Sequence, residues 1–120
     1  MKILVSAAGS DLSAKVDPRF GRAANFLVVD AETMEFEVVA NTQNLNAPQG
    51  AGIQAGKIAV NTGAEVVITG NCGPKAFTVL QQAGLKVVIG AEGKIEDVVT
   101  AYKNGELQPA TDANVEGHWV

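Results

Sequence analysis

The sequence predicts a three-layer α/β domain, in which helices cover both faces of a five-stranded mixed sheet with one antiparallel strand. The hydrophobic fraction is 47% with only 5% aromatic residues, so Val, Ile, Leu and Ala must build the core, as in strands buried beneath helices. In the second half, short apolar runs alternate with helical patterns, which indicates parallel strands. Near the start, two β-type runs adjoin as in a hairpin, which indicates the antiparallel strand.

The first half of the chain contains three of the expected strands. Residues 2–7 form an apolar run that ends at Gly, Ser and Asp, and a long loop then extends to about residue 24. Residues 26–30 and 35–40 are the two hairpin strands, separated by a short loop. In the second of them, apolar residues alternate with Glu35 and Glu37, so we expect one wet face and a position near the sheet edge.

The second half alternates helices with strands. A polar loop over 41–52 leads to a modest helix over 53–62, closed by Gly63, and residues 66–68 form a short buried strand. Pro74 suits the first position of the next helix, which Gly84 ends. A strand over 86–89 follows, and apolar residues at helical spacing from Ile95 to Tyr102 predict the last helix.

Length and composition predict one domain over 1–120, with 106–120 as a flexible tail because no periodicity remains there. No apolar run approaches the roughly 18 residues of a membrane span. The first residues lead directly into a strand instead of a signal peptide, and the single cysteine cannot form an internal disulfide, so we expect a cytoplasmic protein.

The charge is acidic overall but unevenly distributed. The net charge of −4 argues against a protein that binds nucleic acid through a general excess of positive charge. Residues 1–29 hold four cationic and two acidic side chains, a net of +2, and the remainder holds five lysines and eleven acids, a net of −6. Both arginines of the chain, Arg19 and Arg22, lie in the first part, three residues apart.

Three segments are expected to meet outside the carboxyl ends of the strands, where open α/β sheets bind ligands. They are 9–22, 41–52 and 70–74. In the last, two glycines let backbone approach a ligand, and the helix after it directs free N–H groups toward an anion. The same glycines would equally serve a plain strand-to-helix turn, and neither a Walker nor a Rossmann glycine pattern occurs.

The candidate site also includes the 50–52 segment and the arginine loop, which is the loop that follows the first strand and extends to about residue 24. Arg19 and Arg22 carry permanent, planar charges, and Asp17 is placed to hold one of them, although solvated surface arginines are common. The small residues over 50–52 allow something bulky to approach, and they would also suit helix packing. The candidate ligand-binding residues are Arg19, Phe20, Gly21, Arg22, Asn41, Gly50, Ala51, Gly52, Thr69, Gly70, Asn71, Cys72 and Gly73.

Donor atoms for a metal are scarce in this sequence. Cys72 and His118 are metal-ligand candidates, with a small buried hydrophobe as the plainer interpretation of the cysteine. An iron-sulfur cluster built by the protein normally needs four thiolates and a structural zinc four Cys or His, whereas this chain has one of each. A metal cluster would therefore have to arrive already assembled. No nucleophile with a convincing histidine base is evident, so we expect no enzymatic activity.

The order of motifs resembles the dinitrogenase iron-molybdenum cofactor biosynthesis family over nearly the whole chain. The matching segments are Asp17-Pro18-Arg19-Phe20-Gly21-Arg22-Ala23, residues 26–30, Gly50-Ala51-Gly52-Ile53, Val67-Ile68-Thr69-Gly70, Gly73-Pro74-Lys75-Ala76, residues 83–87 and Gly105-Glu106-Leu107. The resemblance implies a ribonuclease H-like sheet without nuclease residues. It also implies binding of iron-molybdenum clusters or their precursors, or of a molybdenum-copper sulfide cluster held without protein ligands.

The resemblance narrows the choice of cluster and suggests a partner. Several relatives have a histidine where this chain has Gln49, so the molybdenum-copper sulfide cluster is favoured over a histidine-ligated iron-molybdenum cofactor. Partnership with a deviant-Walker ATPase is also implied. Two alternatives stay open: a regulatory interaction module whose pocket is vestigial, and an enzyme for a small phosphorylated ligand, which would lack a general base.

Overall fold

The computed structural model describes residues 1–42 and 50–111. Its elements, in chain order, are β1 (Lys2–Ala7), β2 (Asn25–Asp30), β3 (Phe36–Ala40), α1 (Ala51–Asn61), β4 (Val66–Ile68), α2 (Pro74–Gln82), β5 (Lys86–Val88) and α3 (Ile95–Lys103). The order confirms the predicted sequence of strands and helices. The helix α1 begins two residues earlier than expected, because Ala51 and Gly52 are too small to contribute to an apolar pattern.

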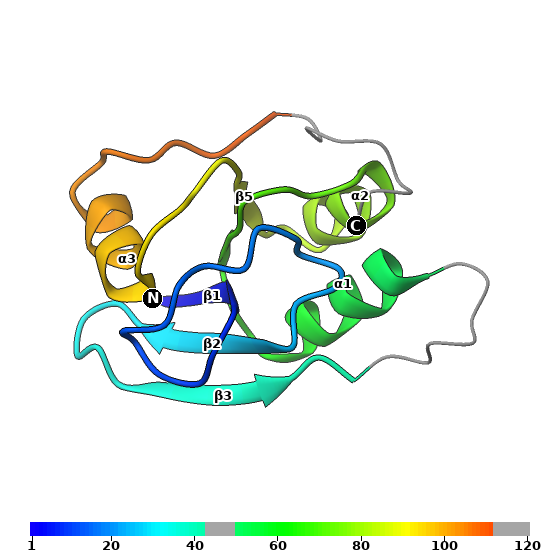
Figure 1. Ribbon diagram of the computed structural model, residues 1–120. Coiled ribbons are helices and arrows are strands. Elements are labelled where there is room, and N and C mark those ends of the chain that lie inside the picture. Colours follow the sequence, from blue (N-terminus) through cyan, green and yellow to red (C-terminus); the bar gives the residue numbers. More distant parts are fainter. Residues whose placement is uncertain (43–49, 112–120) are drawn as a thin grey trace.

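The five strands form one mixed sheet in the order β3-β2-β1-β4-β5. Strand β2 is antiparallel to both of its neighbours, whereas β4 pairs parallel with β1 and β5 parallel with β4. The helices α1 and α2 lie on one face of the sheet and α3 lies on the other (Figure 1). The predicted three-layer fold with one antiparallel strand is therefore confirmed.

Each face of the sheet has its own apolar core. Alternate side chains of β1 point to opposite faces, so Leu4 packs beneath α1 and α2 while Ile3 and Val5 pack beneath α3. The loop after β1 contributes to both cores, through Phe20 on the first face and Val16 on the second. This loop is consequently held against the sheet on both sides.

Strand β3 is an edge strand, as expected, but its two faces differ from the prediction. Phe36 and Val38 are 40% and 44% exposed, and Val39, opposite Phe26 in the register, packs against the core under α1 and α2. The face that carries Phe36 and Val38, which was expected to be buried, is therefore exposed to solvent as well. The physical reason is position, because α3 lies over the middle of the sheet and leaves the edge uncovered.

The described helices are all too short or too polar to cross a membrane. After α3, residues 106–111 run back along the sheet, and the backbone N–H of Ala110 donates to the carbonyl oxygen of Val87 at 2.7 Å. The remainder of the predicted tail, including His118, lies outside the described residues.

Candidate anion-binding site

Three segments meet at the carboxyl edge of the sheet, where β1, β4 and β5 end. The loop after β1 reaches toward the beginnings of α1 and α2 (Figure 1). The turn after β4 forms the start of α2, and residue 50 caps α1. The sequence predicted this convergence, and the contacts that follow join the loop after β1 to the turn after β4 and to Asn41. Residues 43–49 of the predicted third segment lie outside the described residues.

The turn after β4 is joined directly to the arginine loop. Arg19 and Asn71 form a parallel bridge, and the backbone N–H of Phe20 donates to the carbonyl oxygen of Asn71 at 3.1 Å. The side-chain amide of Asn71 donates to the carbonyl oxygen of Pro18 at 2.9 Å. These bonds place the exposed Arg19 next to the residues that start α2.

A buried pair of hydroxyl groups supports the same junction. The hydroxyl of Ser6 donates to the carbonyl oxygen of Asp17 at 2.8 Å and lies 2.8 Å from the hydroxyl of Thr69. Because the Ser6 proton is used on Asp17, the Thr69 hydroxyl must donate to Ser6. Both side chains are fully buried, so Thr69 supports the site from below. A serine within the buried part of the first strand, whose other buried residues are apolar, is the signal by which the sequence could have indicated this pair.

Asp17 holds the backbone of the loop instead of a guanidinium group. Its carboxylate accepts the backbone N–H of Arg19 at 2.9 Å, as in an Asx-turn. Within 1–42 and 50–111, it forms no ion pair with the Arg19 side chain, which corrects the expectation for Asp17. The Arg19 guanidinium is thus left pointing its charge at solvent, where a ligand can reach it.

Asn41 ties the end of β3 to the other flank of the loop. Its side-chain amide donates to the carbonyl oxygens of Gly21 at 3.3 Å and Ala23 at 2.8 Å, and its backbone N–H donates to Ala24. The residue is 8% exposed, and its Oδ1 atom has no hydrogen-bond partner within residues 1–42 and 50–111. Asn41 was expected to contact the ligand, but its donor groups are occupied by the protein.

Two predicted site residues have their side chains in the core. Phe20 is fully buried, and its ring stacks on Phe26 with centroids 5.2 Å apart. Cys72 is also fully buried, and burial raises the pKa of its thiol to about 12. A metal binds the thiolate form, which this environment disfavours. We therefore interpret Phe20 as the anchor of the loop and exclude the Cys72 side chain from the site proposed below.

The first turns of α1 and α2 are suited to an anion. Neither contains an acidic residue or has a side-chain cap, and Lys75 adds a positive charge to the positive end of α2. The first turn of α3 differs, because it contains Glu96 and Asp97 and its N–H groups donate to carbonyl oxygens of the loop after β1. Among the described helices, α1 and α2 are therefore the ones that direct a positive end without acidic residues toward the site.

The predicted ligand-binding residues at this junction differ in their exposure to solvent. Arg19 and Arg22 are exposed, Asn71, Gly50 and Ala51 are half-buried, and Gly21, Gly52, Gly70 and Gly73 are buried. Among the described residues, no three His, Cys, Asp or Glu side chains gather where they could hold a metal ion. This arrangement offers positive charge and backbone dipoles, without a set of metal ligands.

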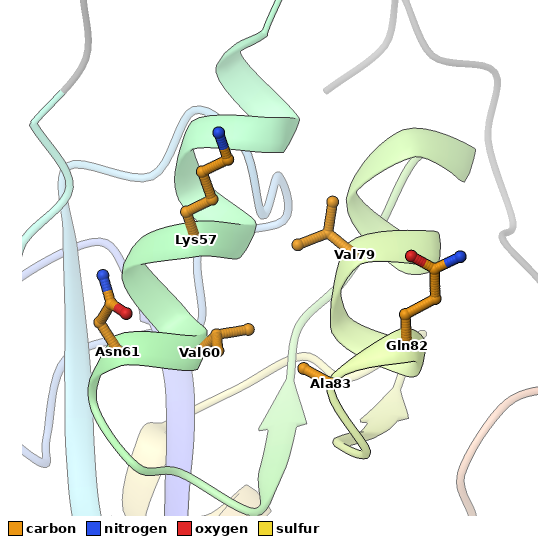
Figure 2. Close-up of a pocket in the computed structure, with 6 residues that line it drawn as sticks. All are labelled: Lys57, Val60, Asn61, Val79, Gln82 and Ala83. Carbon is orange, nitrogen blue, oxygen red and sulfur yellow. The ribbon is translucent and has the colours of Figure 1, made fainter.

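A separate groove lies between the later turns of α1 and α2. It has a volume of about 430 Å³, and Figure 2 shows its lining residues, which are Lys57, Val60, Asn61, Val79, Gln82 and Ala83. These residues lie in the middle and C-terminal parts of the two helices, whereas Gly50 and Pro74 mark the opposite ends. The groove is therefore distinct from the candidate anion site.

Comparison with solved structures shows close relatives of the whole domain. The fold superimposes with a TM-score of 0.91 on the apo form of the orange protein from Desulfovibrio gigas, with 43% identity over 95% of this chain and 96% of that one. A putative NifB protein from Thermotoga gives a TM-score of 0.79 with 32% identity, over 97% and 98% of the two chains.

Comparison of sequences gives the same assignment. An uncharacterized protein of Methanocaldococcus jannaschii is 30% identical over 97 residues, which are 78% of this chain and 81% of the relative. The family model described as dinitrogenase iron-molybdenum cofactor matches residues 1–105. The arginine loop, the 50–52 segment and the turn before α2 all lie within that match. The chain therefore belongs to the dinitrogenase iron-molybdenum cofactor family.

Proposed function

We propose that this protein binds and carries a preformed, anionic metal-sulfur cluster of the molybdenum-copper sulfide type, held without covalent bonds to protein. The observation that supports this most is the junction of the arginine loop with the first turns of α1 and α2, which contain no acidic residue. Guanidinium groups and helix N-termini both favour an anion, and a sulfide cluster is a polyanion. Binding and release, with no chemical step, is the activity that such a site supports.

The type of cluster is argued from the available donors and from the relatives. A cluster that enters complete needs no thiolate from the protein, which is consistent with the buried, protonated Cys72. The family implies iron-molybdenum cofactor or its precursors as the alternative cargo, whereas the similarity to an orange protein favours the molybdenum-copper cluster. A deviant-Walker ATPase partner and a cytoplasmic location remain part of the proposal.

Reconstitution tests the proposal directly. We expect the protein to become coloured when mixed with tetrathiomolybdate and copper, and to keep its visible absorption and both metals after desalting. A parent protein that is colourless after desalting would reject the function. Elemental analysis of protein from its native host separates the two cargoes, because iron with molybdenum and no copper would favour the alternative.

The role of charge is tested by paired substitutions. Replacing both Arg19 and Arg22 by alanine should release the cluster at least tenfold faster, since two charge-assisted contacts are removed. The matched control replaces Lys57 and Lys86 by alanine. It changes the net charge by the same amount, at positions away from the junction. Equal retention by the two double variants would remove the arginines from the site.

A further inference from the structure

We propose that Asn41 is a positioning residue that, together with Asn71, fixes the arginine loop from both flanks, and that it does not itself contact the cluster. This inference rests on the proposed function. The two asparagines come from opposite sides of β1, at the ends of β3 and β4. Each holds carbonyl oxygens of the segment that contains Arg19 and Arg22.

The hydrogen bonds define two points of attachment. On one flank, the Asn71 amide donates to Pro18, directly before Arg19. On the other flank, the Asn41 amide donates to Gly21 and Ala23, which are the residues on either side of Arg22. The four residues 19–22 therefore form a short arc whose two ends are fixed to different strands.

The chemistry of Asn41 argues against direct contact with a sulfide cluster. Both amide hydrogens point at carbonyl oxygens, and rotating the amide by 180° would place Oδ1 against those oxygens, so the orientation is determined. The remaining Oδ1 atom is a buried acceptor, and the part of the chain that the structure describes gives it no hydrogen-bond partner. An acceptor repels an anion, so the effect of Asn41 on the cluster must pass through the loop.

Fixing the arc lowers the entropic cost of binding. Arginine side chains lose rotamer freedom when they grip a ligand, and a mobile backbone would add a further loss. A loop that is already held in place avoids the second loss. Removing the Asn41 amide should therefore accelerate release of the cluster, even though no contact with the cluster is removed.

The test uses Asn41→Ala, with Asn25→Ala as the matched control. Asn25 also donates its amide to a carbonyl oxygen of the same loop, that of Gly9, at 3.5 Å, but far from the arginines in sequence. We expect Asn41→Ala to release the reconstituted cluster about tenfold faster than the parent, and Asn25→Ala to release it within twofold of the parent. Should Asn41→Ala fail to fold, Asn41→Ser keeps one donor and is expected to show an intermediate rate.

A double-mutant cycle separates positioning from a general structural effect. In a background with both arginines replaced by alanine, Asn41→Ala should add less than a twofold change, because the groups through which it acts are absent. A full tenfold effect in that background would overturn the inference. So would equal release rates of Asn41→Ala and the parent.

Hydrogen exchange of the protein without cluster tests the inference independently of the proposed function. The amide of Phe20 donates to Asn71 within the arc, so its exchange should be about tenfold faster in Asn41→Ala than in the parent. Unchanged exchange of the Phe20 amide would refute the positioning role of Asn41 even if the cluster binds. A parent that binds no cluster, with exchange altered as expected, would refute only the function.

Discussion

Gly70 and Pro18 lie so close that a methyl group on Gly70 would come within 2.8 Å of the Pro18 Cα atom. The contact joins the turn after β4 to the arginine loop, backbone against backbone. Because the atoms that such a methyl group would meet are backbone atoms and not the flexible end of a side chain, a side chain at position 70 would require the backbone to shift.

Gly70→Ala should lower the free energy of unfolding by about 2 kcal/mol, because the new methyl group can be accommodated only by backbone shifts. Gly56→Ala is the control, since its methyl group would meet the Val79 side chain at 3.0 Å and alanine is favoured over glycine within a helix. We expect its effect to be near zero. Urea unfolding of both variants measures the difference, and similar losses would contradict the steric argument.

Thr69→Val should cost about 1–2 kcal/mol of folding free energy, because the shape is kept while buried Ser6 loses the hydrogen bond it accepts. Thr100→Val is the matched control, since that hydroxyl donates to Glu96 on an exposed helix surface. Its effect should stay within about 0.5 kcal/mol. Thermal or urea unfolding distinguishes the two, and an equally small loss for Thr69→Val would show that the hydroxyl pair contributes little.

Lys75→Glu should change stability and cluster retention in opposite directions. An acid in the first turn of α2 complements the helix dipole and is expected to add about 0.3–1 kcal/mol of stability. The same charge should repel an anionic cluster and accelerate its release. Lys57→Glu alters the net charge equally in the middle of α1, and should change both measurements less. Faster release from Lys57→Glu than from Lys75→Glu would argue against a site at the start of α2.

Alkaline pH should destabilise the protein through Cys72. Burial raises the pKa of this thiol from 9.0 to about 12, so between these values the unfolded chain releases a proton that the folded chain retains. Ionisation then favours the unfolded state, and the stabilising difference that exists below pH 9 is lost as the pH rises toward 12. In that window the slope is about 1.4 kcal/mol per pH unit.

Comparing the parent with Cys72→Ala isolates this contribution from those of lysine and tyrosine. The stability difference between the two proteins, measured by urea unfolding, should be constant below pH 9 and shrink above it. A difference that stays constant up to pH 11 would show that the thiol ionises normally. Slow reaction of the folded parent with a thiol reagent at pH 8 is expected for the same reason.

The architecture was predictable because its signals are local. The apolar run of β1, the Pro74 start of α2 and the spacing from Ile95 to Tyr102 each identify an element without reference to the others. The exposure of Phe36 and Val38 was not predictable, because it depends on how far α3 extends over the sheet. That extent is a property of packing, which alternation in one strand does not encode.

The meeting of the loops at the candidate site was predictable in the same way, but the hydrogen bonds that its residues form were not. Loops after parallel strands converge by topology, so the arginine loop and the turn after β4 were expected to meet. Asn41 and Asn71 were expected to face a ligand, yet both donate to backbone carbonyl oxygens. A polar side chain in a loop serves its own backbone or a ligand equally well by composition, and only the geometry decides.

The hydrogen bond from Ala110 to Val87 has a consequence for self-association. An edge strand with unpaired backbone N–H and C=O groups is a template on which a second chain can add a strand. Proteins that leave such edges open tend to aggregate. By donating to β5, Ala110 occupies one of the outward carbonyl oxygens of this edge strand. Truncating the protein after residue 107 would leave the β5 edge without this hydrogen bond. That edge would lack a mid-strand charge like the one that Glu37 places on the β3 edge.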